Sequence, residues 1–152
     1  MLNEDYREML SLFIENKVEF LIVGAYAMGV HGFPRATGDI DFWINPTALN
    51  ASLVYSSLQQ FGAPLANLEP KDFSTRGLIL QVGIAPRRID IITEIDGVDF
   101  DKAYDSKIFV EIDGLNVPVI SKKNLIKNKL STGRKKDQLD AEYLQLDDNN
   151  DL

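Results

Sequence analysis

The chain has 152 residues, of which 45% are hydrophobic and 26% charged, a composition typical of a globular protein that buries one sizeable core. Its formal net charge of -7 argues against general DNA binding, which requires an excess of Lys and Arg to contact phosphates. The sequence has no cysteine, no apolar run near the roughly 18 residues of a membrane span, and no secretory signal pattern, so we expect a cytoplasmic protein that uses neither disulfides nor thiolate metal sites.

The first elements of the chain are predicted from apolar spacing. Apolar residues at three- and four-residue intervals predict an amphipathic helix over residues 3–16, capped by Asn3. Residues 19–23 form a short apolar run of the buried-strand type. Gly24 ends this run, and the small, helix-compatible residues 25–30 predict a second helix that begins at the turn.

The turn at Gly24 and Ala25 is a candidate phosphate site. Backbone N–H groups at a helix N-terminus favour anions, and small side chains let a phosphate approach the main chain. A Gly-Ala pair after a strand is also a common tight turn, so the alternative is a turn that binds nothing.

Two aspartates follow in a strand predicted over residues 38–44. Alternate side chains of a strand share a face, so Asp39 and Asp41 project together. At about 4 Å and an effective dielectric constant near 20, two carboxylates repel by roughly 4 kcal/mol. A divalent cation that prefers oxygen ligands would offset this repulsion, which makes Mg²⁺ or Mn²⁺ the natural candidate. The alternative is a solvated strand end in which the acids bind nothing.

A third aspartate lies in a later strand. Two apolar runs, residues 78–85 and 87–95, predict paired strands or one bent strand. Asp90 lies inside the second run between two isoleucines, where packing gives no reason for an acid. If this strand neighbours the earlier one, opposed side chains come within about 5 Å, and Asp90 joins Asp39 and Asp41. The alternative is an edge-strand residue that faces water.

The remaining segments complete a mixed α/β fold, with one domain over residues 1–146 and a frayed tail over residues 147–152. We expect helices over residues 49–61, from Ser121 to Gly133 and over residues 135–146, and a hairpin over residues 109–120. The residues predicted to face the core are Leu49, Leu53, Leu58 and Phe61 of the first helix, Leu125, Ile126 and Leu130 of the second, and Leu139, Tyr143, Leu144 and Leu146 of the third.

Positive charge gathers in two places. Residues 122–136 contain seven Lys and Arg residues and no acid, which is unusual in an acidic protein. Arg35 lies in the connection that leads to the strand of Asp39, where it can reach a bound phosphate. A phosphate-rich ligand beside a carboxylate cluster explains why both signs occur; a solvated helix face and a surface arginine are the alternatives.

Three stretches together resemble the nucleotidyltransferase superfamily that includes DNA polymerase β. They are Val23-Gly24-Ala25, Asp39-Ile40-Asp41 and Ile89-Asp90-Ile91, which match the order and spacing of the pattern of that superfamily. A later stretch, NKLSTGRKKDQLDAEYL, contains Lys129, Asp137 and Asp140 and is similar to a helical motif of the AbiEii-type toxins and minimal nucleotidyltransferases of toxin–antitoxin pairs. The resemblance covers about residues 20–146 and implies a mixed β-sheet flanked by helices, with further helices at the C-terminus.

The resemblance also implies roles for individual residues. Asp39, Asp41 and Asp90 would bind Mg²⁺ or Mn²⁺, and Asp90 would also act as the base for an incoming hydroxyl. Asp137 would position the phosphate or serve catalysis. The predicted nucleotide-binding residues are Gly24, Ala25, Arg35 and Lys129. Ala25 has no hydroxyl, so only backbone contacts to phosphate are available there.

The function that we expect is metal-dependent transfer of a nucleoside monophosphate from a nucleoside triphosphate to a hydroxyl of RNA such as tRNA, of a partner protein or of a small molecule, within a toxin–antitoxin system. One alternative is a catalytically weak module of the same fold that binds nucleotides or a partner, which the lack of a hydroxyl at Ala25 keeps open. A structural protein with an acidic pocket and no ligand is a third.

Overall fold

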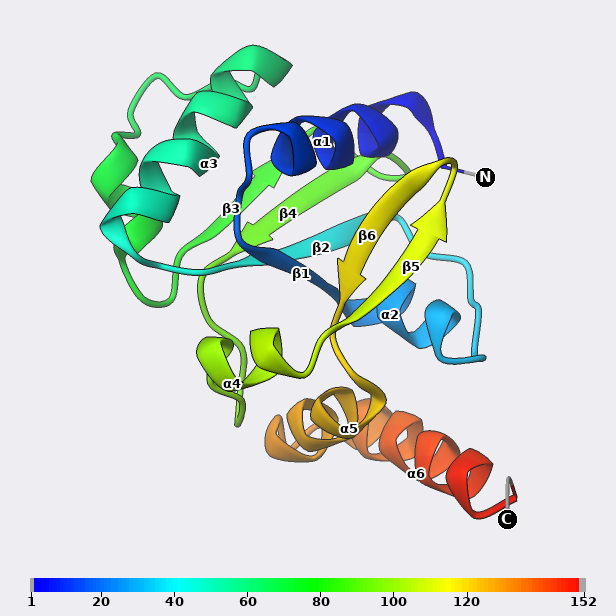
Figure 1. Ribbon diagram of the computed structural model, residues 1–152. Coiled ribbons are helices and arrows are strands. Elements are labelled where there is room, and N and C mark those ends of the chain that lie inside the picture. The colour runs from blue at the N-terminus through cyan, green and yellow to red at the C-terminus, as the bar shows by residue number, and fades with distance from the viewer. Residues whose placement is uncertain (1, 151–152) are drawn as a thin grey trace.

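The computed structural model describes the backbone of residues 2–150 and the side chains of residues 2–147. The described residues form a mixed six-stranded sheet with the strand order β3-β4-β2-β1-β6-β5, flanked by helices (Figure 1). The strands are β1 (Phe20–Val23), β2 (Asp39–Ile44), β3 (Ile79–Val82), β4 (Arg88–Ile92), β5 (Ile108–Ile112) and β6 (Leu115–Val119). The helices are α1 (Glu4–Glu15), α2 (Gly24–Val30), α3 (Ala48–Phe61), α4 (Phe100–Asp105), α5 (Lys122–Ser131) and α6 (Lys135–Asn150), with a 3-10 helix, η1, at Pro70–Ser74. Among the described residues, no helix is both long and apolar enough to cross a membrane.

Side-chain caps set the beginnings of several helices, including the predicted cap Asn3. Asn3 accepts a hydrogen bond from the backbone N–H of Tyr6 at the start of α1, and Thr47 and Ser121 cap α3 and α5 in the same way. Gly62 ends α3 in the left-handed conformation, with φ of 92°. The predicted mixed α/β fold with C-terminal helices is confirmed.

The central strands bring the predicted motifs to one place. β1 pairs with β2 antiparallel, and β2 pairs with β4 parallel, with Asp41 opposite both Val23 and Asp90. The end of β1, where Gly24 begins α2, therefore lies beside the first residues of β2 and β4. The two apolar runs over residues 78–85 and 87–95 form the antiparallel pair β3 and β4, which is the first of the two predicted arrangements.

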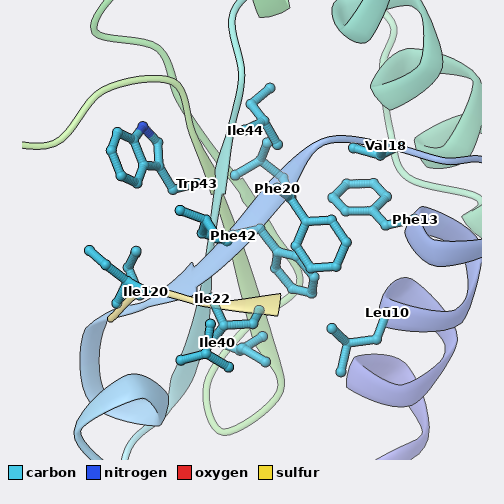
Figure 2. Packing of buried hydrophobic residues seen from close by; sticks show 14 of the residues in the cluster. Leu10, Phe13, Val18, Phe20, Ile22, Ile40, Phe42, Trp43, Ile44 and Ile120 are labelled. Carbon is cyan, nitrogen blue, oxygen red and sulfur yellow. The ribbon is translucent and has the colours of Figure 1, made fainter. Parts of the chain in front are cut away.

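The two faces of the sheet are covered by different helices. Figure 1 shows α1 and α3 on one side and α4, α5 and α6 on the other. On the first side the ring of Phe42 lies 5.2 Å from that of Phe13 and 5.5 Å from that of Phe20 (Figure 2). On the second side the ring of Trp43 lies 5.0 Å from that of Phe100. Because alternate residues share a face, the residues of β2 that accompany Trp43 on the second side are the two aspartates.

Several predicted core residues are exposed instead. Leu49 of α3 is 76% exposed, and the buried apolar residues of this helix are Ala51, Val54 and Leu58. In α6 the wrong face was predicted: Leu144 is buried, but Leu139, Tyr143 and Leu146 are each more than half exposed. In α5, Leu130 is 48% exposed. The buried face of α6 instead carries Asp137, Asp140 and Ala141, because this helix packs acids against basic side chains.

The last helix is longer than predicted. It continues beyond Leu146 to Asn150, and Asp147 pairs with Lys122 of α5 at 2.8 Å. This ion pair ties the extra turn of α6 to the neighbouring helix. Residues 151–152 of the predicted tail lie outside the described residues.

Candidate active site

The three aspartates that the sequence singled out lie together on the second face of the sheet. Asp39 and Asp41 come from β2 and Asp90 from β4, and one carboxylate oxygen of each lies within 4.8 Å of the others. The parallel register that sets Asp41 opposite Asp90 produces this convergence, and strand alternation adds Asp39. The predicted meeting of the three acids is confirmed, whereas their chemical roles stay predictions.

Crowding of like charges in a partly desolvated place shifts the pKa values of these acids. Burial, together with the charges of Asp39 and Asp90, raises the pKa of Asp41 to about 7. Burial also raises the pKa of Asp90, although hydrogen bonds from Arg88 oppose the shift. Burial acts in the same direction on Asp39, but hydrogen bonds from Thr37 and Arg88 outweigh it and lower the pKa of that carboxyl. One of the three acids therefore resists ionisation near neutral pH.

Arg88 was not among the predicted site residues, yet it bridges two of the acids. Its Nε lies 2.8 Å from Oδ1 of Asp90, and its Nη2 lies 3.0 Å from Oδ2 of Asp90 and 3.1 Å from Oδ2 of Asp39. Arg88 stands two residues before Asp90, so strand alternation puts the two on one face, and the pairing of β4 with β2 sets Arg88 opposite Asp39. Its guanidinium offsets part of the repulsion that a cation alone was expected to balance.

Gly24 has a steric role that the sequence pattern did not show. Its φ of +70° is a conformation that favours glycine, and a methyl group built on its Cα would overlap Oδ2 of Asp41. Gly24 also begins α2, which no side chain of the described residues caps. The residue thus lets the backbone of the β1–α2 turn approach the carboxylates closely.

A second cluster combines basic side chains with two buried acids of α6. Nζ of Lys129 lies 3.3 Å from Oδ1 of Asp137 and 3.1 Å from Oδ2 of Asp140. Arg35 donates to both oxygens of Asp140, with the shorter contact at 2.7 Å. Arg134 and the hydroxyl of Thr132 donate to Oδ2 of Asp137. These pairs fix Arg35 and Lys129 in place.

The acids of this second cluster are ionised. Burial by itself would raise the pKa of Asp137 and Asp140, but hydrogen bonds and nearby cations outweigh that effect and lower both. For Asp137 the first of these partners is Thr132, followed by Lys129; for Asp140 it is Arg35, also followed by Lys129. Each acid therefore holds a basic side chain as a charged donor.

One cavity of about 330 Å³ joins the two clusters. The carboxylates of β2 lie on one wall, and basic side chains of the 31–38 connection, α5 and α6 lie on the others. Asp90, whose carboxylate lies beside those of Asp39 and Asp41, is not among the lining residues. The lining residues are Gly24, Ala25, Arg35, Ala36, Thr37, Asp39, Asp41, Lys129, Arg134, Lys136 and Asp137. Every other predicted site residue is thus brought to one space, with acids facing bases across it.

Comparison with known proteins identifies the fold. No model of a protein family and no curated protein sequence matches the chain. A candidate nucleotidyltransferase from Thermotoga maritima superposes with a TM-score of 0.62 and 21% identity, covering 99% of this chain and 96% of its own. The lincosamide adenylyltransferase LnuA, solved with lincomycin, gives 0.57 and 16%, covering 95% and 97%. ANT(2")-Ia, solved with adenylyl-2"-tobramycin, gives 0.54 and 14%, covering 92% and 94%. The chain therefore has the fold of these nucleotidyltransferases.

Proposed function

We propose that the chain is a metal-dependent nucleotidyltransferase that moves a nucleoside monophosphate from a nucleoside triphosphate to an acceptor hydroxyl. The observation that carries the proposal is the single cavity in which Asp39 and Asp41 face Arg35 and Lys129. Carboxylates suit divalent cations, and fixed basic side chains suit the phosphates that such cations accompany. The fold shared with nucleotidyltransferases supports the same reading.

The carboxylate cluster fits a divalent cation. It offers only oxygen ligands, and one oxygen from each of Asp39, Asp41 and Asp90 lies within 4.8 Å of the others. Arg88 donates to Asp39 and Asp90, so Asp41 keeps the larger share of free lone pairs. These three residues would hold Mg²⁺ or Mn²⁺, which supplies charge neutralisation of the reacting phosphate and a more acidic hydroxyl when bound.

The basic side chains can receive a triphosphate without giving up their present partners. Lys129 has three N–H donors, of which Asp137 and Asp140 take two, so one remains for a phosphate oxygen. Arg35 keeps donors beyond the two that contact Asp140. A neighbouring cavity of about 490 Å³, which shares Ala25, Arg35 and Thr37 with the first, has room for the nucleoside.

The proposed reaction forms one bond and breaks another at the α-phosphorus. Asp90 accepts the proton of the acceptor hydroxyl, whose oxygen attacks the α-phosphorus. The bond between the α-phosphorus and the oxygen that bridges to the β-phosphate breaks, and pyrophosphate leaves. Lys129 and Arg35 hold the triphosphate while negative charge moves onto the leaving oxygens.

A labelling experiment tests the proposal. The purified protein is given triphosphates labelled at the α-phosphate, Mg²⁺, and candidate RNA, protein and small-molecule acceptors, and pyrophosphate release is followed in parallel. We expect Asp39→Asn to lose at least a hundredfold in rate, while Asp105→Asn, which removes an exposed acid of α4, keeps the wild-type rate. Equal rates for the wild type and Asp39→Asn would overturn the proposal.

A nucleotide-binding module without catalysis is the second candidate, and the position of Arg88 favours it. The guanidinium already bridges Asp39 and Asp90, so the acids are partly neutralised without a divalent ion. Calorimetry separates the two functions: triphosphate binding without pyrophosphate release on any acceptor supports the module. An AbiEii-type relationship, a toxin–antitoxin role, tRNA or a partner protein as acceptor, and a cytoplasmic location are finer proposals that rest on the sequence resemblance and composition.

A further inference from the structure

We propose that a third cavity, whose lining includes Trp43 two residues beyond Asp41 in β2, binds the acceptor of the transfer reaction, and that this acceptor is a small cationic molecule with a hydroxyl group. The inference rests on the proposed function. The cavity has a volume of about 540 Å³ and lies between the ends of β2 and β4 and the segment that leads into α4. Its charged and aromatic lining residues are Trp43, Arg76, Glu94, Asp96, Asp99, Phe100 and Asp101.

The register of the sheet places this cavity beside the reacting groups. Trp43 follows Asp41 by two residues in β2, so its side chain stands on the same face, about 6.5 Å further along the strand. In β4, Ile92 follows Asp90 in the same way and pairs with Trp43. A molecule seated over Trp43 therefore lies about 6.5 Å along β2 from Asp41, and Asp90, the residue proposed to take the proton of the acceptor hydroxyl, lies opposite Asp41 on the neighbouring strand.

The charge of the cavity selects the class of molecule. Four acids line it, Glu94, Asp96, Asp99 and Asp101, against one base, Arg76, which lies 3.8 Å from Glu94. A cation is attracted there, whereas a second phosphate compound is repelled. This is the opposite of the triphosphate cavity, where basic residues predominate on the walls away from β2. The two spaces thus differ in the sign of the ligand that they favour.

The indole of Trp43 marks a place for a hydrogen-bond acceptor. Trp43 is 1% exposed, and its Nε1 is a buried side-chain atom for which the described residues provide no partner. Buried indole N–H groups normally have one. Figure 2 shows the ring turned away from Phe13 and Phe42, with its nitrogen at the outer end. A hydroxyl oxygen of a ligand in the cavity would satisfy this donor once the ligand is seated.

A direct binding experiment follows from the composition of the chain, which contains one tryptophan. The Nε1–H resonance of Trp43 in ¹⁵N-labelled protein reports on this cavity without metal, nucleotide or turnover. The probes have similar sizes but different charges: 2-deoxystreptamine carries two amines, myo-inositol is neutral, and glucuronate is an anion. We expect a saturable shift with 2-deoxystreptamine, a much smaller one with myo-inositol and none with glucuronate.

Matched variants attribute the binding to the acids of the cavity. Asp96→Asn with Asp101→Asn removes two lining charges, and we expect the dissociation constant of 2-deoxystreptamine to rise about tenfold. Glu8→Gln with Glu142→Gln removes the same charge from exposed positions on α1 and α6 and should leave it unchanged. An unmoved indole resonance in folded protein, equal shifts with all three probes, or equal weakening in both double variants would overturn the proposal.

Pyrophosphate release then tests the role as acceptor separately from the proposed function. If the cavity holds the acceptor, 2-deoxystreptamine changes the rate of Asp39-dependent pyrophosphate release, either because it accepts the nucleotide or because it competes with another acceptor. The concentration at half-maximal change should equal the one found from the Trp43 resonance. The Asp96→Asn, Asp101→Asn variant should shift both concentrations alike. An unchanged rate would overturn the acceptor role and leave the proposed function standing. Absence of any pyrophosphate release would overturn the proposed function, and the acceptor role with it, even where the cation binds.

Discussion

Replacement of Asp41 by Asn should stabilise the metal-free protein at alkaline pH. The pKa of Asp41 rises from 3.8 to about 7 on folding, because of burial first and the charges of Asp39 and Asp90 second. A shift of about three units corresponds to about 4 kcal/mol of unfavourable free energy when the carboxylate is ionised. The Asn side chain has the same shape and carries no charge, so this penalty disappears.

The sign of the pH dependence follows from the direction of the shift. Below pH 3.8 both the folded and the unfolded protein hold the proton of Asp41, and the charge penalty is absent. Between pH 4 and 7 the folded state keeps a proton that the unfolded state has released, so the free energy of unfolding falls as the pH rises. Above pH 7 the full penalty applies. Asp41→Asn should lack this fall.

Urea denaturation in EDTA at pH 5 and pH 8 measures the effect. With a typical slope of about 2 kcal/mol per M urea, a gain of 4 kcal/mol moves the midpoint by about 2 M at pH 8, and the gain should be much smaller at pH 5. Asp105→Asn, an exposed acid of α4, should show no such gain. A midpoint of Asp41→Asn that is equal to or below the wild-type value at pH 8 would refute the electrostatic reasoning.

Three further substitutions test other parts of the site. Gly24→Ala should weaken Mn²⁺ binding at least tenfold in a calorimetric titration, because the added methyl displaces Asp41. The control is Gly62→Ala, which has similar backbone strain but open space around it and should bind Mn²⁺ as the wild type does. Arg88→Met should lower the urea midpoint in EDTA at pH 8, and saturating Mn²⁺ should restore most of it; an unchanged midpoint in EDTA would contradict the bridging role. Lys129→Met should weaken ATP binding at least tenfold by calorimetry, whereas the exposed Lys123→Met should not, and equal affinities would exclude Lys129 from the phosphate site.

Strand periodicity predicted part of the carboxylate cluster, and the pairing of β2 with β4 completes it. Asp39 and Asp41 had to share a face once their strand was recognised, and the isoleucines on either side of Asp90 marked it as an acid inside a buried strand. Arg88 obeys the same alternation, but an arginine at the beginning of a strand is usually solvated, so its contact with two acids emerges only from the pairing of β2 with β4.

Long-range packing explains what the sequence could not predict. The apolar residues Leu139, Tyr143 and Leu146 indicate a helix correctly, yet the other face of α6 is buried because its acids meet Lys129 and Arg35. Those partners come from distant segments, so helical periodicity contains no information about them. The cavity over Trp43 likewise depends on where the segment before α4 lies across the sheet.

The central claim is that the three aspartates and the basic residues across the cavity bind a divalent ion and a triphosphate together. Electron paramagnetic resonance of Mn²⁺ in the presence of ATP tests it most directly. We predict that the wild-type protein gives a protein-bound Mn²⁺–ATP spectrum with coupling to phosphorus, and that Asp41→Asn returns it to the spectrum of free Mn²⁺–ATP. Identical spectra with and without the wild-type protein would contradict the account.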